Sequence, residues 1–168
     1  KWLKRKAPFS SLPTSSWYNL AYGNDIVVAI SNTTNGSTAA SSIDGITWVT
    51  RTISAAGTGR GWYGCSFGNG IFVATTGGGS TTLAASSTDG ISWTSRTIGS
   101  GDWRSVAYGN GTFIAIGYNS NSTQLSIDGI NWTSGATLPY VSNWIDITFD
   151  QSLNRFVAIS NTSGTISA

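Results

Sequence analysis

The stretch that decides the fold is Trp103-Arg-Ser-Val-Ala-Tyr-Gly-Asn110, because the chain repeats its pattern. Four such stretches begin at intervals of 45, 41 and 41 residues, with the tryptophans Trp17, Trp62, Trp103 and Trp144. A short apolar run follows each of them, such as residues 113–116 after Trp103. Self-similarity at a fixed spacing of this size indicates that the chain is built from stacked copies of one supersecondary unit.

A second element recurs between these stretches. Ser126-Ile-Asp-Gly-Ile-Asn-Trp132 has counterparts at residues 42–48 and 87–93, each with Ser, Asp, Gly and Trp at the same places. The Asp-Gly pair is a turn signal, because Gly accepts a positive φ without a Cβ clash. Each repeat therefore predicts four strands: the first starts at the Trp and turns at Gly-Asn into the second. A polar loop leads to the third, and the Asp-Gly turn joins the third to the fourth.

This pattern predicts an all-β protein, a β-propeller of four-stranded antiparallel blades with about four repeats of roughly 42 residues. The second strand of each repeat is apolar on both faces, so a neighbouring blade is expected on either side of it. The predicted blades cover residues 17–53, 61–98, 103–134 and, in part, 143–168. We treat residues 1–168 as one propeller domain or as a segment of a larger ring.

The first six residues fit the repeat as a fourth strand. Trp2 precedes Trp17 by 15 residues, much as Trp48 precedes Trp62 by 14, and Arg5 follows Trp2 by three as Arg51 follows Trp48. Lys1–Lys6 is therefore expected to be a fourth strand whose own first three strands are missing. It either completes the partial blade 143–168 or belongs to a longer array of blades.

Composition excludes several classes of function. The net charge is +2, and Lys1, Lys4, Arg5 and Lys6 hold much of the positive charge, so a nucleic-acid partner is not expected. No apolar run approaches the ~20 residues of a membrane span, so we expect no membrane insertion. The lone Cys65 is expected to pack as a small buried hydrophobe.

The Ser-x-Asp-Gly-x-x-Trp element resembles the Asp box, or bacterial neuraminidase repeat, of sialidase-type β-propellers. It differs from the usual form, which has one more residue between Asp and Gly. The phrase Tyr108-Gly-Asn-Gly-Thr-Phe-Ile-Ala115 is also similar to repeats of phage tail-fibre and secreted bacterial surface proteins. The resemblance implies a structural Asp box on the face opposite any ligand site. Its residues here are Asp44, Gly45, Trp48, Asp89, Gly90, Trp93, Asp128, Gly129 and Trp132.

Catalysis is not expected from these 168 residues. A sialidase needs a Tyr nucleophile supported by a Glu, and this chain has neither Glu nor His. Two-carboxylate glycoside hydrolysis could use only Asp, and three of the seven Asp residues are the turn residues above. Without His, and with a single Cys, no metal site or cofactor site is predicted. We therefore predict a protein that is not an enzyme.

Binding is the remaining possibility, and the loops that do not repeat are its expected location. The recurring Trp17, Trp62, Trp103 and Trp144 are interpreted as inter-blade packing. Side chains that do not recur and that suit sugar recognition, through rings, amides and guanidinium groups, form the candidate ligand-binding set: Arg60, Arg104, Tyr118, Asn119 and Tyr140.

The sequence favours a non-catalytic propeller module of a virion or cell-surface appendage such as a tail fibre, with a structural or host-attachment role. Its expected partners are other subunits of that appendage and a host glycan, and its expected location is extracellular or on a virion. Two alternatives stay open: a secreted carbohydrate-binding module, and a piece of a larger Asp-box glycosidase whose catalytic residues lie outside this chain.

Overall fold

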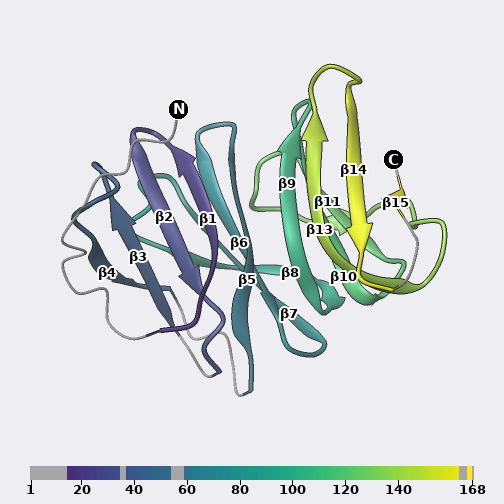
Figure 1. The fold of residues 1–168 in the computed structure, drawn as a ribbon, viewed down its shortest axis with the longest axis horizontal. Coiled ribbons are helices and arrows are strands. Elements are labelled where there is room, and N and C mark those ends of the chain that lie inside the picture. The colour runs from purple at the N-terminus through teal and green to yellow at the C-terminus, as the bar shows by residue number, and fades with distance from the viewer. Residues whose placement is uncertain (1–14, 35–36, 54–58, 163–165, 168) are drawn as a thin grey trace.

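The computed structural model describes residues 15–34, 37–53, 59–162 and 166–167. These residues form β-strands and no helix, which confirms the all-β prediction, and so none of them forms a helical membrane span. The strands make successive antiparallel sheets, which we name blades I to IV, and the blades follow one another along an arc (Figure 1).

Blades I and II each have four strands in the order of the chain, and each strand pairs with the next. Blade I consists of β1 (Trp17–Gly23), β2 (Ile26–Ser31), β3 (Thr38–Ser42) and β4 (Val49–Thr52). Blade II consists of β5 (Gly61–Gly68), β6 (Ile71–Gly77), β7 (Thr81–Ser87) and β8 (Thr94–Gly101).

Blades III and IV keep this strand order within each blade, but β10 of blade III also pairs with β13 of blade IV, which joins the two blades into one seven-stranded sheet. Blade III consists of β9 (Trp103–Gly109), β10 (Thr112–Ser120), β11 (Thr123–Ser126) and β12 (Thr133–Ser134). The described part of blade IV consists of β13 (Ser142–Asp150), β14 (Arg155–Ser160) and β15 (Ile166–Ser167). The predicted strand Lys1–Lys6 lies outside the described residues, so its place in the ring stays a prediction.

The turns between first and second strands explain why each repeat folds as a meander. Asn69-Gly70 and Asn110-Gly111 have positive φ at both residues, with values between 46° and 78°. Turns of this kind match the right-handed twist of two paired strands, and Asn and Gly tolerate the left-handed backbone.

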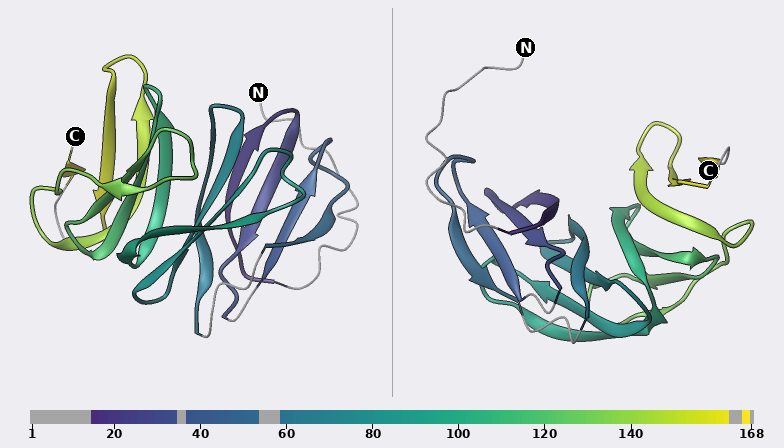
Figure 2. Two further views of the ribbon diagram at one scale, coloured as in Figure 1. Left: turned by 180° about the vertical axis from the view of Figure 1, so that it is seen from behind. Right: turned by 60° about the horizontal axis from the view of Figure 1, so that its bottom comes forward.

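The first strand of each blade lies on the inner side of the arc (Figure 2). The strands β1, β5, β9 and β13 pack against one another in that order, whereas the fourth strands spread apart on the outside. A side chain near the start of one first strand can therefore reach the neighbouring blade.

The core lies between the blades and is divided into three clusters, one at each interface. Trp62, Trp103 and Trp144 are at most 1% exposed, which confirms that they are packing residues. Trp17 is only half-buried, because no described blade precedes blade I. The fold thus buries a tryptophan at each interface between two described blades.

Candidate functional site

The three Ser-x-Asp-Gly turns have the same internal hydrogen bonds. In the turn of blade II, Asp89 Oδ1 accepts hydrogen bonds from the backbone N–H groups of Ile91 and Ser92, both at 2.8 Å. The Ser87 hydroxyl also donates to Asp89, at 2.9 Å. Asp44 and Asp128 accept the same bonds in blades I and III. Gly45, Gly90 and Gly129 follow them with φ of 68° to 69°.

These bonds decide the charge of the turn carboxylates. Backbone hydrogen bonds from Thr47 and Ile46 lower the pKa of Asp44 to about 2, because they stabilise the ionised form. Backbone hydrogen bonds also lower the pKa values of Asp89 and Asp128. A carboxylate that stays ionised and saturated with backbone donors is a structural element, and it has no proton to offer as a general acid.

The last residue of each Ser-x-Asp-Gly-x-x-Trp element is a tryptophan, and in blades II and III it packs against the core. Trp93 packs against the cluster between blades I and II, and Trp132 against the cluster between blades II and III. Trp48 of blade I is half-buried, since it faces the open end of the arc.

The turns and the non-repeating loops lie on opposite faces of the arc. Asn24, in the first turn of blade I, donates through Nδ2 to the Thr88 carbonyl in the Ser-x-Asp-Gly turn of blade II at 3.0 Å. Asn69 donates in the same way to Ile127 of blade III at 3.4 Å. The two kinds of turn therefore share one face. The loops that join second to third strands, and one blade to the next, lie on the other.

A β-bulge interrupts the first strand of every blade directly after its tryptophan. The register with the second strand shifts at the same point in all four copies. A bulge bends its strand and redirects one side chain, and bulges are common beside binding sites. The redirected positions carry tyrosine in the first two blades and other residues in the next two: Tyr18, Tyr63, Arg104 and Ile145.

These bulge residues form a continuous line across three blades on the inner side of the arc. The rings of Tyr18 and Tyr63 meet edge to face, with centroids 4.8 Å apart. The Arg104 guanidinium carbon lies 4.3 Å from the centroid of Tyr63 and 4.5 Å from the centroid of Tyr118. Arg104 is therefore held between two rings, in the geometry of a cation–π contact.

Asp102 fixes Arg104 from one side. Its two carboxylate oxygens accept hydrogen bonds from Arg104 Nε at 2.7 Å and Nη2 at 3.1 Å. Burial works against the charged guanidinium, but the hydrogen bond and charge of Asp102 outweigh it and raise the pKa of Arg104. The bidentate pair is close to neutral overall.

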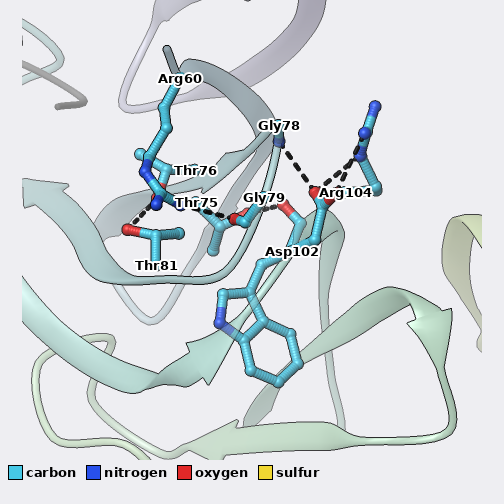
Figure 3. Close-up of polar contacts among 9 residues, drawn as sticks. Arg60, Thr75, Thr76, Gly78, Gly79, Thr81, Asp102 and Arg104 are labelled. Atoms are coloured by element: carbon cyan, nitrogen blue, oxygen red, sulfur yellow. Dashed lines mark hydrogen bonds and ion pairs between the residues drawn. The ribbon is translucent and has the colours of Figure 1, made fainter. Parts of the chain in front are cut away.

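The loop after β6 completes the cluster (Figure 3). Gly78 N–H donates to Asp102 Oδ1 at 3.0 Å, and Arg60 Nη1 donates to the Gly79 carbonyl at 2.7 Å. Gly78 and Gly79 have φ of 92° and 127°, values that L side chains rarely adopt. The Asp102 carboxylate and the Arg60 guanidinium thus hold the backbone of this loop by hydrogen bonds to Gly78 and Gly79.

A pocket of about 430 Å³ lies beside this cluster, between the loops of blades II and III. Its lining includes Asp102, Tyr118 and the exposed Asn119. The hydroxyl-bearing residues Ser80, Ser100 and Ser120 line the remainder. The pocket therefore offers one aromatic surface and many hydrogen-bonding groups.

Two further hollows in the described residues are more apolar and lie elsewhere. One of about 420 Å³ lies between blades III and IV, among Ile114, Leu125, Leu138 and Phe156. Another of about 480 Å³ lies on the open face of blade I, among Trp17, Leu20 and Trp48. Both are at places where an inter-blade interface is incomplete, so we interpret them as packing surfaces.

The structure brings most of the sequence-predicted ligand residues together. Tyr118 and Asn119 line the pocket, Arg104 lies over the Tyr118 ring, and Arg60 holds the neighbouring loop through the Gly79 carbonyl. Tyr140 is elsewhere: it stacks on Trp144 with centroids 5.2 Å apart and packs against the core between blades III and IV. Its position is that of a packing residue, because the loop before β13 folds back onto the Trp144 ring.

Sequence reasoning missed Tyr18 and Tyr63, which extend the cluster along blades I and II. A signal was present in the sequence. Both residues directly follow a recurring tryptophan, at a position that is Tyr in the first two repeats, Arg in the third and Ile in the fourth. Only the bulge, which is a property of strand pairing, explains why that position is the one that is redirected.

The chemistry of the cluster suits binding. The described residues contain no group of three or more potential metal-binding side chains. Burial raises the pKa of the Cys65 thiol to about 12, so it is not a nucleophile at neutral pH. The remaining Asp side chains outside the turns and the cluster accept hydrogen bonds from Tyr22, Ser105 or Ser152. Every carboxylate of the described chain thus has a structural partner.

No protein-family model matches the sequence, and the search of curated proteins also gives no match. Solved structures do resemble the fold. A streptogramin B lyase superposes with a TM-score of 0.73 at 15% identity, over 93% of this chain and 52% of that chain. YCF48 bound to a D1 peptide gives a TM-score of 0.68 at 20% identity, over 96% of this chain and 50% of that chain.

A GH74 enzyme of Niastella koreensis gives a TM-score of 0.62 at 20% identity, over 90% of this chain and 22% of that chain. These structures are β-propeller-like, and the likeness supports the predicted propeller of four-stranded blades. At these identities the similarity concerns the fold alone. This chain spans about half the length of the first two structures.

Proposed function

We propose that this chain is a non-catalytic β-propeller module of a virion or cell-surface appendage. We further propose that the cluster of Tyr63, Arg104 and Tyr118, with the pocket beside it, attaches the appendage to a host glycan. The observation that carries the proposal is the cluster of Tyr63, Arg104 and Tyr118 beside a polar pocket. The resemblance of the repeats to sialidase-type Asp-box propellers and to tail-fibre proteins gives the context.

Sugar recognition fits the groups present at the cluster. The apolar face of a pyranose stacks on an aromatic ring, while its hydroxyls exchange hydrogen bonds with amides, hydroxyls and guanidinium groups. Tyr118 supplies the ring, and Asn119 and the pocket serines supply the polar groups. Because Asp102 neutralises Arg104, the cluster favours an uncharged saccharide over an acidic one.

Glycosidase chemistry has little support within this chain. Hydrolysis needs two carboxyl groups on opposite sides of a scissile bond, one of them able to donate a proton. Asp102 is the carboxylate of the cluster, and Arg104 and Gly78 already occupy its oxygens. The likeness to a GH74 enzyme concerns the fold alone. The alternative is an Asp-box glycosidase whose catalytic residues lie outside this chain, and the sequence of a longer polypeptide would test it. A secreted carbohydrate-binding module would use the same cluster.

A glycan array with matched variants tests this proposal. We expect the wild-type chain to bind a set of neutral glycans and Tyr118→Ala to bind them at least tenfold more weakly, since an aromatic contact of ~1.5 kcal/mol is lost. Arg155→Ala is the control, because Arg155 is exposed on the turn face and should leave binding unchanged. Circular dichroism checks that both variants fold.

Salt dependence provides a second readout of the same experiment. Binding through rings and a neutral ion pair should change less than about threefold between 50 and 500 mM salt, because screening acts on net charge. The proposal is wrong if the wild type binds no glycan, or if Tyr118→Ala binds as well as the wild type does.

A further inference from the structure

The pocket beside Tyr118, which we call the Tyr118 pocket, has a second polar pocket next to it. This second one, the Gln124 pocket, has a volume of about 260 Å³ and is lined by the end of β8 and by β11 and β12. Ser100 lines both pockets, with Gly101 on the side of the Tyr118 pocket and Gly99 on the side of the Gln124 pocket. The two pockets therefore adjoin where blade II meets blade III.

Gln124 brings a buried amide to a strand position where the repeat has alanine. The matching residues of blades I and II are Ala40 and Ala85, so packing alone does not require a polar side chain there. Gln124 is 6% exposed, and its Oε1 accepts a hydrogen bond from the Gly99 N–H at 3.2 Å. Its Nε2 donates to the Ser134 hydroxyl at 3.3 Å. An amide has two N–H groups and a carbonyl with two lone pairs, so these bonds orient Gln124 and leave it able to form others.

The strand segment between the two pockets is held by hydrogen bonds and carries little side-chain bulk. The Gly99 carbonyl accepts a hydrogen bond from Trp103 Nε1 at 2.7 Å. A Cβ atom at Gly99 would lie 2.6 Å from Nε2 of Gln124, and one at Gly101 would lie 2.5 Å from the Trp103 ring. Both positions therefore exclude side chains, and Ser100 is the residue between them that has one. A ligand that extends from one pocket to the other would pass close to this backbone.

The chemistry of the Gln124 pocket suits an uncharged ligand that is rich in hydroxyl groups. The described residues that line it carry no charge, and the exposed Ser122 and Thr137 add hydroxyl groups to the amide of Gln124. Amides and hydroxyls both donate and accept hydrogen bonds, as sugar hydroxyls do. An acidic group would lose its hydration there without gaining a positively charged partner.

We propose that the Gln124 pocket is a second saccharide subsite, and that the glycan bound by this chain is an uncharged oligosaccharide of at least two sugar units. This assignment rests on the proposed function, which places one unit against the Tyr118 ring. The adjoining unit passes Ser100 and exchanges hydrogen bonds with Gln124 in the second pocket. Specificity for the linkage between the two units then depends on residues 99–101, which a monosaccharide would not cross.

Matched variants of blades II and III test the second subsite. Ser134→Trp puts a large ring at the exposed edge of the Gln124 pocket, where Ser134 pairs with Gln124. Ser95→Trp is the control, because Ser95 pairs with Ala85 at the same place in blade II and lines neither pocket. The probes are neutral homo-oligomers of glucose, galactose, mannose and N-acetylglucosamine, one to four units long, and NMR titration measures their dissociation constants.

We expect the wild type and Ser95→Trp to bind at least one oligomer tenfold or more tightly than its monomer. Ser134→Trp should lose this gain, while its affinity for the monomer stays within about twofold of the wild type. Gln124→Ala is a smaller change and should reduce the gain at least threefold, because the amide is lost. Tyr118→Ala should weaken the binding of monomer and oligomer alike. Circular dichroism checks that each variant folds.

Two results would overturn the second subsite and leave glycan attachment standing. The wild type could bind a monomer as tightly as its oligomers, or folded Ser134→Trp and Gln124→Ala could both keep the preference for oligomers. Binding of none of the probes would overturn the second subsite together with the proposed function.

Discussion

A few residues decide the behaviour of each blade through their local hydrogen bonds. Asp44, Asp89 and Asp128 order their own turns, and a carboxylate suits this task because it accepts several N–H groups at once. Arg104 has a comparable role on the other face, where it joins Asp102 to the rings of Tyr63 and Tyr118.

The depressed pKa of Asp44 predicts an acid-dependent loss of stability. The folded chain keeps Asp44 ionised down to about pH 2, whereas the unfolded chain binds the proton near its ordinary pKa of 3.8. The stabilisation is therefore fully present above about pH 5 and declines as the pH falls toward 2. Urea unfolding from pH 2 to 6 checks this. Asp44→Ala should be less stable than the wild type at pH 6, and the two should converge near pH 2. A constant difference would contradict the assignment.

At the scale of the strands, the contact between aromatic ring and glycine links one blade to the next. In blades I to III the first strand ends in a glycine, because an aromatic ring of the following blade lies directly over the backbone there. The pairs are Gly23 with Phe67, Gly68 with Tyr108 and Gly109 with Phe149. The cross-strand bonds from Arg51 to Ser41 and from Arg96 to Ser86, both 2.8 Å, hold the outer strands of blades I and II in register. In blade III, Gly135 replaces the arginine, and Thr123 and Leu125 fill the space.

Gly109→Ala should destabilise the chain by about 3 kcal/mol, because the new methyl group would overlap the Phe149 ring in a packed interface. Gly111→Ala is the matched control, since its Cβ would meet nothing and only its positive φ of 78° is strained. We expect the control to cost about 1 kcal/mol. Urea unfolding measures both. Equal losses for the two variants would show that the ring contact is not tight.

Across the whole molecule, stability should follow the number of neighbours that a blade has. Among the described residues, blades II and III have a neighbouring blade on both sides, whereas blade I has only blade II and blade IV has only blade III as a neighbour. In a stack of repeats, each unit is stabilised chiefly by its neighbours, so the ends open first.

Hydrogen exchange followed by mass spectrometry tests this gradient. Amides of β6 and β10 should exchange at least tenfold more slowly than those of β2 and β14, because opening the inner blades breaks two interfaces each. Uniform protection along the chain would indicate that the four blades unfold as one unit.

The sequence by itself determined the blades. The 41- to 45-residue repeat, the Asp-Gly turns and the alternation of apolar residues act over short distances in the chain, and they specify strand order and packing tryptophans without reference to anything remote. The sequence also indicated Arg104, Tyr118 and Asn119, because residues that differ between otherwise matching repeats can be recognised when the repeats are compared. It could not place Tyr140, whose loop folds back onto Trp144.

Only the tertiary structure decided which of the non-repeating residues meet. Tyr18, Tyr63 and Arg104 lie more than 40 residues apart in the chain, and they come together because a bulge in each first strand turns one side chain along the inner side of the arc. The same is true of the first blade. Phe67, Tyr108 and Phe149 each cover a glycine of the preceding blade, whereas Tyr22 is 65% exposed, and this difference follows from contacts between blades, which local pattern does not encode.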